Sequence, residues 1–260
     1  MKKRKIIKGM LCMTFILLFI VSFFYFHRDI SEYHKVKKTY AGIKEKAEDD
    51  RTESIDWEAL WKVNRNIVAW LKIPGTEVDY PVVQTKNNSE YLSKDINGDY
   101  SIYGAIFLDE RLYGTDLGTN PNNIIYGHNM GRWTDVMFGT LKEYLSSPYL
   151  KGHERVILYT PEGTYHYRIA SVAYATESSD IYNTEFRETV FTDWVKEQTE
   201  KSLYRCLKEG IINAYADRFS GENPDKKELS EYGNTLTLST CDTTHGNDKK
   251  IAIFCIPENS

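Results

Sequence analysis

The sequence predicts a mainly β fold with added helices, an α+β protein whose strands form a barrel or a sandwich. From residue 67 onward, short apolar runs alternate with clusters of turn-forming residues, which is the pattern of many short strands. Two stretches with apolar residues at helical spacing, 134–145 and about 185–208, interrupt these runs. An uncharged apolar run also lies near the N-terminus, at 9–26. The 260 residues therefore allow one domain of ordinary size plus an N-terminal appendage.

The N-terminal segment is predicted to anchor the chain in a membrane. Residues 1–8 carry a cluster of Lys and Arg, and the run 9–26 is about long enough to cross a bilayer as a helix. The positive-inside rule places residues 1–8 in the cytoplasm and the rest of the chain outside the cell. A cleaved signal peptide is the alternative, but the aromatic run 21–26 is a poor cleavage site, because cleavage needs small residues. We therefore expect an uncleaved single-pass signal anchor in the cell membrane.

Two helical segments are predicted to follow the anchor. Residues 27–54 are strongly charged and contain little Gly or Pro, which predicts a solvated helical stalk. A second, short helix has Trp57, Leu60 and Trp61 on one face, at positions i, i+3 and i+4. This face is expected to pack onto the domain formed by residues 55–260.

Eight strands are predicted in this domain, each from a short run rich in apolar and β-branched residues. The sequence Pro-Glu-Gly-Thr at 161–164 predicts a hairpin turn between two of them. The two helical stretches are expected to be amphipathic and to face the core. The predicted strands are 67–73, 78–83, 105–109, 123–127, 155–160, 164–175, 235–241 and 250–256.

The run 234–241 alternates leucines with hydroxyl-bearing residues and ends in Cys241. In a strand, this alternation turns Leu236 and Leu238 to one face, and the thiol with its neighbouring hydroxyl groups to the other. A polar loop with turn chemistry follows at 242–248, so the cysteine lies at an open strand end where a thiol can react. The alternative is a small buried hydrophobic side chain, which is the commoner role of a free cysteine.

A reactive thiol needs a base or an ion-pair partner, because the thiolate is the nucleophile. The short apolar run 122–126 delivers His128 at its end, and Gly127 leaves room for a close approach. Two strands that end in His128 and Cys241 form a catalytic pair if they lie side by side. The other histidines are weaker candidates, because they lie beside the membrane, at the start of a strand, within a hairpin or, for His245, in a polar loop.

Charge and cysteine spacing argue against other kinds of function. With a net charge of −4 and no basic patch beyond the N-terminus, we expect no nucleic-acid partner. The sequence contains no CxxC motif and no His and Cys cluster with zinc spacing, so we expect neither a catalytic metal nor another cofactor. Cys206, Cys241 and Cys255 follow the anchor, and a Cys206–Cys255 disulfide is an open alternative that leaves Cys241 free.

At these residues the sequence resembles a known family. The motif Thr-Leu-Ser-Thr-Cys at 237–241, with Tyr-Gly-His at 126–128 upstream, is similar to the sortases, and specifically to class B. Segments 79–84, 104–109 and 137–141 also look like class B segments, in the expected order. The resemblance covers most of the chain after the stalk. It implies a closed eight-stranded barrel with N-terminal helices and a long helix between the sixth and seventh strands, which is the place of the second helical stretch.

The resemblance also implies an activity, that of a membrane-anchored cysteine transpeptidase. Such an enzyme cleaves the C-terminal sorting motif of a secreted protein through an acyl-enzyme on Cys241, with His128 as the proton donor. It then transfers the acyl group to an amine, either of a peptidoglycan precursor or of a lysine in a pilin subunit. Wall anchoring and pilus assembly are both open. Asn88 and Leu92 match positions that help to line the class B substrate groove, and Ser239 and Asp242 flank the nucleophile. We expect all four to contact the substrate.

One position departs from the family pattern. Sortases carry an arginine at the start of the strand after the nucleophile's loop, and Lys250 stands there in this sequence. Lysine keeps a positive charge that can stabilise an oxyanion, but it lacks the planar guanidinium fork. We expect Lys250 to be the third catalytic residue, with Arg218 as an alternative source of the cation. If neither serves, the chain is a catalytically weak or inactive membrane-anchored binding or scaffold protein with a degenerate site.

Two other classes of cysteine enzyme fit the sequence less well. Papain-like and cell-wall cysteine hydrolases usually place the cysteine before the histidine, whereas His128 precedes Cys241 here. An L,D-transpeptidase has its nucleophile in a Ser-x-Gly-Cys-x-Arg context, which the residues around Cys241 lack.

Overall fold

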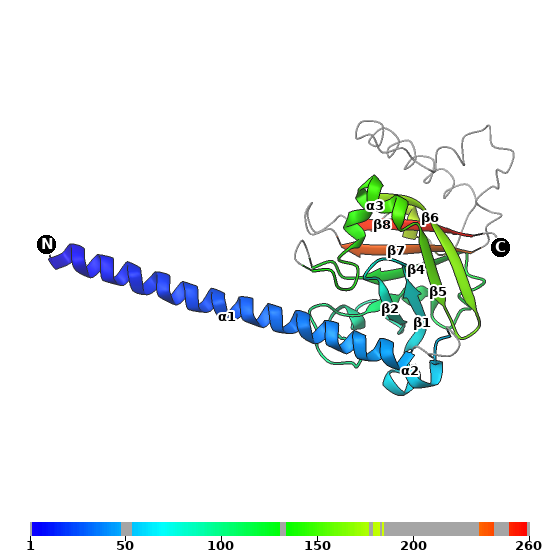
Figure 1. The fold of residues 1–260 in the computed structure, drawn as a ribbon, viewed down its shortest axis with the longest axis horizontal. Helices are drawn as coiled ribbons and strands as arrows, with labels where there is room; N and C mark the ends of the chain where they lie inside the picture. The colour runs from blue at the N-terminus through cyan, green and yellow to red at the C-terminus, as the bar shows by residue number, and fades with distance from the viewer. Residues whose placement is uncertain are drawn as a thin grey trace. The chain divides into compact units, whose positions relative to one another are not determined.

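The computed structural model describes residues 2–47, 54–130, 134–176, 179–182, 184, 234–241 and 250–258. The backbone divides into two compact units, Met1–Gly42 and Ile43–Ser260. The first unit is the N-terminal part of one long helix, α1 (Lys2–Ala47), whose last residues belong to the second unit (Figure 1). Among the described residues, α1 is the one helix whose length and apolar character suit a bilayer span. Its large apolar side chains between Ile7 and Phe26 are exposed, as those of a membrane anchor would be.

The eight predicted strands are all present, and they form a closed barrel in the order β1-β2-β3-β4-β7-β8-β6-β5 (Figure 1). Closure comes from the antiparallel pairing of β1 with β5, in which Trp70 lies opposite Tyr159. This pairing decides between a barrel and a sandwich, and it confirms the barrel that the family resemblance implies. The strands are β1 (Ile67–Lys72), β2 (Asp79–Val83), β3 (Ile106–Leu108), β4 (Asn122–Gly127), β5 (Arg155–Tyr159), β6 (Thr164–Ala175), β7 (Thr235–Cys241) and β8 (Lys250–Pro257).

The parallel pairing of β4 with β7 matters most for the site. Six residue pairs join the two strands, and the last of them is Gly127 with Thr240. Parallel neighbours need a long crossover connection, and β5 and β6 lie between these two strands in the sequence. As a consequence, β4 and β7 finish at the same end of the barrel. β8 is antiparallel to β7 and begins at that end, where Lys250 lies opposite Cys241.

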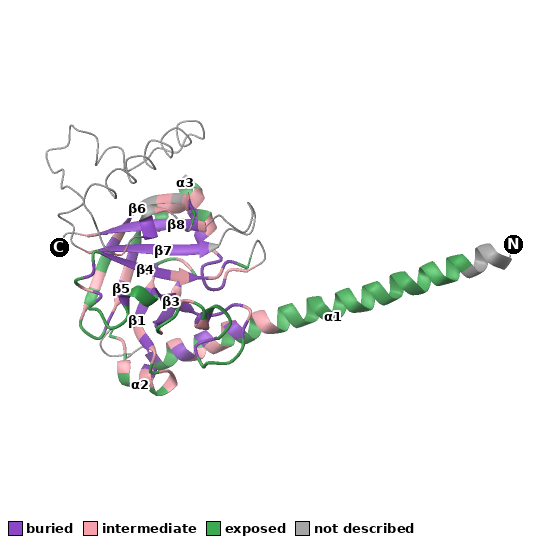
Figure 2. Ribbon diagram, turned by 180° about the vertical axis from the view of Figure 1, so that it is seen from behind, coloured by how far each residue is buried: buried purple, intermediate pink, exposed green. Residues whose placement is uncertain are grey.

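Both faces of β7 are covered by other parts of the chain (Figure 2). Leu236 and Leu238 are fully buried, and Thr237 and Ser239 on the alternate face are at most 1% exposed. The alternation is the predicted one. The hydroxyl-bearing face is nevertheless covered, because hydrogen bonds join it and the neighbouring β4 to the short 3₁₀ helix η4 (Asp180–Tyr182).

The helix α2 (Trp57–Val63) has the predicted inward face. Asp56 caps its N-terminus by accepting a hydrogen bond of 2.9 Å from a backbone N–H of the first turn. Leu60 is fully buried, and Trp61 Nε1 donates to the carbonyl of Ile67 at 3.0 Å. The helix is therefore fixed to the first strand of the barrel by both apolar burial and a hydrogen bond.

The second unit also includes the C-terminal end of α1, which was expected to be part of a solvated stalk. Ile43 and Ala47 are buried, and Lys44 forms an ion pair with Asp79 on β2. Trp70 Nε1 donates to the same carboxylate at 2.7 Å. The last turn of α1 therefore packs on the barrel, and the compact unit starts before the predicted domain boundary at residue 55.

The helix predicted at 134–145 is wrong. This stretch forms turns that lead into a short 3₁₀ helix, η3 (Leu141–Leu145). Met137 has a φ of 54°, in the left-handed region, and Phe138 donates its backbone N–H to the carbonyl of His128 at 3.0 Å. The apolar spacing therefore reflects burial against the barrel, because Met137 and Phe138 are fully buried without a continuous helix. The other predicted helix, at 185–208, lies outside the described residues. The remaining short helices are η1 (Glu90–Leu92), η2 (Glu110–Leu112) and α3 (Ser147–Gly152).

Candidate active site

The strand register brings the two predicted catalytic residues together. Tyr126 pairs with Ser239 and Gly127 with Thr240, so His128 and Cys241 follow at equivalent positions of two neighbouring parallel strands. Neighbouring strands are about 4.8 Å apart, a distance that a histidine side chain spans. The side-by-side arrangement that the sequence required for a catalytic pair is therefore present in the backbone.

His128 is half-buried and is held by a neighbouring loop. Its Nε2 lies 2.7 Å from the carbonyl oxygen of Leu92. A carbonyl oxygen only accepts hydrogen bonds, so Nε2 carries a proton and Nδ1 is the nitrogen left to act as a base. Gly104 makes this contact sterically possible. Its φ is +57°, and a Cβ there would lie 2.4 Å from the carbonyl oxygen of Tyr91 and 3.0 Å from the His128 ring.

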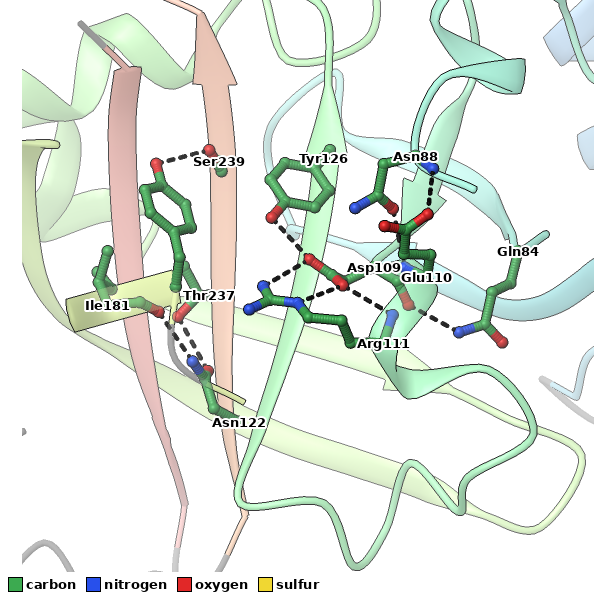
Figure 3. Close-up of polar contacts among 11 residues, drawn as sticks. Gln84, Asn88, Asp109, Glu110, Arg111, Asn122, Tyr126, Ile181, Thr237 and Ser239 are labelled. Carbon is green, nitrogen blue, oxygen red and sulfur yellow. Dashed lines mark hydrogen bonds and ion pairs between the residues drawn. The ribbon is translucent and has the colours of Figure 1, made fainter. Parts of the chain in front are cut away.

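The loop that carries Leu92 is itself tied to the next segment of the barrel (Figure 3). Asn88 Oδ1 accepts from the backbone N–H of Glu110 at 2.8 Å, and the Asn88 N–H donates to the Glu110 carboxylate at 3.1 Å. The amide oxygen of Asn88 is thus engaged within the loop. Leu92 is 43% exposed, and its backbone carbonyl is the partner of His128. Of the two predicted groove residues in this loop, Leu92 is the one whose backbone contacts His128.

Of the two predicted groove residues near the cysteine, the structure describes Ser239, which is buried. Ser239 is 1% exposed, and its hydroxyl is hydrogen-bonded to that of Tyr182 at 2.9 Å. Thr237 Oγ1 donates to Asn122 Oδ1 at 2.9 Å, and so continues the same polar face along β7 (Figure 3). Asp242 lies outside the described residues, as does Arg218, the alternative source of a cation. Ser239 therefore supports a neighbouring tyrosine and presents little surface of its own.

Lys250 is the first residue of β8, and it lies opposite Cys241 in the antiparallel pair. Residues that are directly opposite in such a pair have side chains on the same face of the sheet. The Lys250 Nζ lies 5.8 Å from the centroid of the Tyr126 ring and 5.6 Å from that of Tyr182, within the range of a cation–π interaction. Neither tyrosine was predicted from the sequence as a partner of Lys250. For Tyr126 a signal was available, because it stands two residues before His128 and so shares its face of the strand.

A buried carboxylate lies behind Tyr126 (Figure 3). Asp109 is fully buried, and it accepts hydrogen bonds from the Tyr126 hydroxyl at 2.8 Å and from Arg111 Nε and Nη2 at 2.9 and 2.8 Å. Burial alone raises the pKa of the Asp109 carboxyl, but the bonds from Arg111 and Tyr126 outweigh it, and the pKa lies below its ordinary value. Burial and then the charge of Asp109 raise the pKa of Tyr126, so this phenol stays protonated and acts as a donor.

Neither Cys255 nor a metal-binding cluster offers a second reactive centre in the part of the chain that the structure describes. Cys255 is a free, fully buried thiol, and burial raises its pKa, so it is unreactive as a nucleophile. Within the described ranges, no three His, Cys, Asp or Glu side chains come close enough to bind one metal ion together.

Comparison with known proteins identifies the family. A family model described as the Sortase domain matches residues 71–257. Sortase B of Staphylococcus aureus is 31% identical over 195 residues, which cover 75% of this chain and 70% of that protein. Sortase B of Listeria monocytogenes is 32% identical over 193 residues, which cover 73% of this chain and 68% of that protein.

Solved structures give the same result. Sortase B from B. anthracis matches with a TM-score of 0.67 and 26% identity, over 88% of this chain and 100% of that one. A Staphylococcus aureus sortase B–substrate complex matches with a TM-score of 0.63 and 26% identity, over 89% of this chain and 97% of that one. The barrel, the order of its segments and the His and Cys strand ends all agree with this similarity. The chain therefore belongs to the sortase family of cysteine transpeptidases, and within it to class B.

Proposed function

We propose that this chain is a membrane-anchored transpeptidase with Cys241 as the nucleophile, His128 as the general acid and base, and Lys250 as an oxyanion donor. The observation that carries the proposal is the strand register at one end of the barrel. His128 and Cys241 follow the last paired residues of two parallel strands, and Lys250 begins the strand on the other side of Cys241. Three adjacent strands thus supply a base, a thiol and a cation to one point.

The proposed chemistry has two halves. The Cys241 thiolate attacks a peptide carbonyl carbon, and as the C–S bond forms the carbonyl oxygen becomes an oxyanion, which the Lys250 ammonium and backbone N–H groups stabilise. His128 starts as the imidazolium and gives its Nδ1 proton to the leaving amine as the C–N bond breaks, because Nε2–H is held by Leu92. An incoming amine then attacks the thioester, loses a proton to His128 and releases the Cys241 thiolate.

The proposed substrate is a secreted protein with a C-terminal sorting signal. The acceptor is the amine of a peptidoglycan precursor or of a pilin lysine. A substrate complex of Staphylococcus aureus sortase B among the similar structures supports this class of substrate. Leu92 and Asn88, on the loop beside His128, and Asp242, next to the nucleophile, are the proposed groove residues. Ser239, which is buried, is proposed to act on the groove through its bond to Tyr182. Leu92 is the candidate for direct contact because its side chain is exposed.

The helix α1 is the proposed membrane anchor. Its uncharged run follows a basic segment, which favours residues 1–8 in the cytoplasm and the barrel on the extracellular side. This location matches a substrate that has already been exported, and it gives the enzyme access to acceptors at the cell surface.

The test of the function is acylation of the full chain in detergent. The chain is mixed with peptides from the C-terminal tails of secreted proteins, with and without an added amine, and mass spectrometry detects the thioester and the transfer product. We expect a thioester in the wild type, and neither thioester nor product in Cys241→Ala, with an unchanged circular dichroism spectrum. Cys12→Ala, in the apolar helix, is the matched control and should behave as the wild type. Cleavage by Cys241→Ala at the wild-type rate would exclude this cysteine as the nucleophile.

A second candidate function follows from Lys250. A lysine in place of the family's arginine suits a protein that binds sorting peptides without processing them, a membrane-anchored scaffold with a degenerate site. The same assay separates the two functions. Peptide binding without any thioester, under conditions where Cys241 is reduced, would favour the scaffold.

A further inference from the structure

The ammonium group of Lys250 lies against two aromatic rings that come from different parts of the chain. The Tyr126 ring, from β4, and the Tyr182 ring, from η4, are stacked with centroids 6.3 Å apart and an angle of 23° between their planes. Lys250 Nζ is 5.8 Å from one centroid and 5.6 Å from the other. A cation at this distance from a ring face is attracted by the electrons of the ring. The same ammonium therefore lies within cation–π range of both rings.

Each ring is fixed by its own hydroxyl group. Tyr126 donates to the fully buried carboxylate of Asp109 at 2.8 Å, and Tyr182 is hydrogen-bonded to Ser239 at 2.9 Å (Figure 3). The ring of Phe107 packs on Tyr126, with centroids 5.3 Å apart. Because both hydroxyls are bonded and Tyr182 is only 7% exposed, the two rings form a preformed surface and do not need to be ordered by the lysine.

The carboxylate behind Tyr126 also affects the strength of the contact. A phenol that donates a hydrogen bond to an anion becomes richer in ring electrons, and a richer ring attracts a cation more strongly. Asp109 remains ionised because Arg111 pairs with it through two hydrogen bonds. Four side chains thus follow one another in contact. The Arg111 guanidinium pairs with the Asp109 carboxylate, the carboxylate accepts from Tyr126, and the electron-rich Tyr126 ring faces the Lys250 ammonium.

A lysine needs such support more than an arginine does. An ammonium is a point charge on a flexible four-carbon stem, whereas a guanidinium is a planar fork that orients itself through two parallel hydrogen bonds. Without other restraints, a lysine at position 250 would spend only part of its time at a carbonyl held near Cys241. The register sets Lys250 and Cys241 on the same face of the sheet, and the two rings restrict the ammonium on that face.

We propose that Tyr126 and Tyr182 are positioning residues, which form a cation–π seat that holds the Lys250 ammonium in place for oxyanion stabilisation. The inference rests on the proposed function, because it takes Lys250 as the cation of the transpeptidase. It adds two residues to the reaction, both of which act through Lys250. It also explains how a lysine can serve where the family uses an arginine.

The test separates ring electrons from ring shape. Position 182 of the full chain is replaced by phenylalanine and by phenylalanines with increasing numbers of ring fluorines, which keep the shape but weaken the attraction for a cation. We expect kcat for the sorting peptide to fall stepwise, by roughly tenfold across the series, with KM nearly unchanged. The same series at Tyr144, a buried tyrosine whose ring packs edge-on against Tyr149, is the control and should leave kcat constant.

A double-mutant cycle links the effect to the cation. Tyr182→Leu should lower kcat by roughly tenfold in the wild-type chain, and by less than about twofold in Lys250→Met, where there is no ammonium to hold. Lys250→Arg should recover most of the activity of Tyr182→Leu, because the fork orients itself. Tyr126→Phe should retain more activity than Tyr126→Leu.

Two results would contradict the proposal that Tyr126 and Tyr182 position the Lys250 ammonium. One is a kcat that does not depend on fluorination at position 182, and the other is the same loss for Tyr182→Leu with and without the lysine. Either result, together with a large loss in Lys250→Met, leaves the proposed function standing and removes only the seat. Absence of a thioester in the wild-type chain is the separate result that removes the function itself.

Discussion

The replacement Asp109→Asn is predicted to destabilise the barrel, because Asp109 is a fully buried charge with several partners. Its carboxylate receives two hydrogen bonds from the Arg111 side chain, one from the Arg111 backbone N–H at 2.9 Å, and one from the Tyr126 hydroxyl. Asparagine has the same shape and keeps one acceptor oxygen, but it turns the other oxygen into an NH₂ group that points donors at a guanidinium.

The expected loss follows from those contacts. A hydrogen bond to a charged group contributes about 1.5–3 kcal/mol net. The Arg111 side chain is 46% exposed and can be hydrated again when its partner is lost, so its two bonds are counted together as a single contribution within that range. The Tyr126 hydroxyl can still donate to the remaining amide oxygen. We therefore expect the free energy of unfolding to fall by about 2 kcal/mol at neutral pH.

The pH dependence gives the prediction its sharpest form. The pKa of Asp109 is lowered in the folded chain from its ordinary value of 3.8, so the folded state favours the ionised form. Its contribution to stability is fully present above that ordinary value, and is lost as the pH falls through the lower folded pKa. The difference in stability between the wild type and Asp109→Asn should therefore be constant from pH 7 to about 5 and shrink below pH 4.

The assay is urea unfolding of the full chain in detergent, followed by tryptophan fluorescence, since Trp70 is buried in the barrel. Asp99→Asn is the control, because Asp99 is exposed, and it should change stability by less than about 0.5 kcal/mol. A difference between wild type and Asp109→Asn that stays the same at pH 7 and below pH 4 would refute the role of the ionised carboxylate.

The remaining predictions concern Lys250 and the membrane topology. Lys250→Ala should lower kcat/KM for the sorting peptide by roughly a hundredfold, since loss of an oxyanion donor costs on the order of 2–4 kcal/mol. Lys250→Arg should retain activity, and Lys62→Ala, an exposed lysine on α2, should be silent; near-wild-type kcat/KM in Lys250→Ala would shift the search to Arg218 and the other arginines. Protease added to protoplasts should digest the barrel and spare the anchor. Protection of the barrel, or a mature chain that starts near residue 30, would contradict the predicted anchor.

The strands of this fold could be predicted from the sequence because the signal for each of them is local. Runs such as β6 (Thr164–Ala175) and β7 (Thr235–Cys241) show their apolar and β-branched residues directly, and turn formers mark their ends. Closure of the barrel could not be predicted from such local patterns. It depends on pairings between distant strands, such as β1 with β5 and β4 with β7, which no local pattern encodes.

The failed helix at 134–145 has a physical reason as well. Spacing at i and i+4 predicts a helix when one face is buried, but in this stretch the buried side chains are held by tertiary contacts. The backbone N–H of Phe138 bonds to the carbonyl of His128, and a Cβ at position 139 would lie 2.5 Å from the carbonyl oxygen of Thr134. The backbone therefore forms turns that bring the Phe138 N–H to the carbonyl of His128, in place of a continuous helix.

The difference between local patterns and contacts of distant residues also explains which parts of the site could be predicted from the sequence. Cys241 and His128 stand at the ends of regular runs, so their placement follows from strand periodicity. Asp109 is the N-cap of the 3₁₀ helix η2 and Tyr182 is the last residue of the 3₁₀ helix η4, and their contacts with Tyr126 exist only in the folded barrel. An Asp-x-Arg sequence at 109–111 carries no signal of a buried ion pair, because most such pairs lie on the surface.

The direction of three strands accounts for the composition of the site. A parallel pair brings the C-terminal ends of both strands to one edge, so β4 and β7 each offer the residue that follows or ends the strand, His128 and Cys241. An antiparallel neighbour brings its N-terminal end to the same edge, so β8 offers its first residue, Lys250. Base and nucleophile must therefore come late in their strands and the cation early in its own. A one-residue shift of β8 would turn Lys250 to the opposite face, away from Tyr126. A cation at the site therefore requires both the lysine and the β7–β8 register.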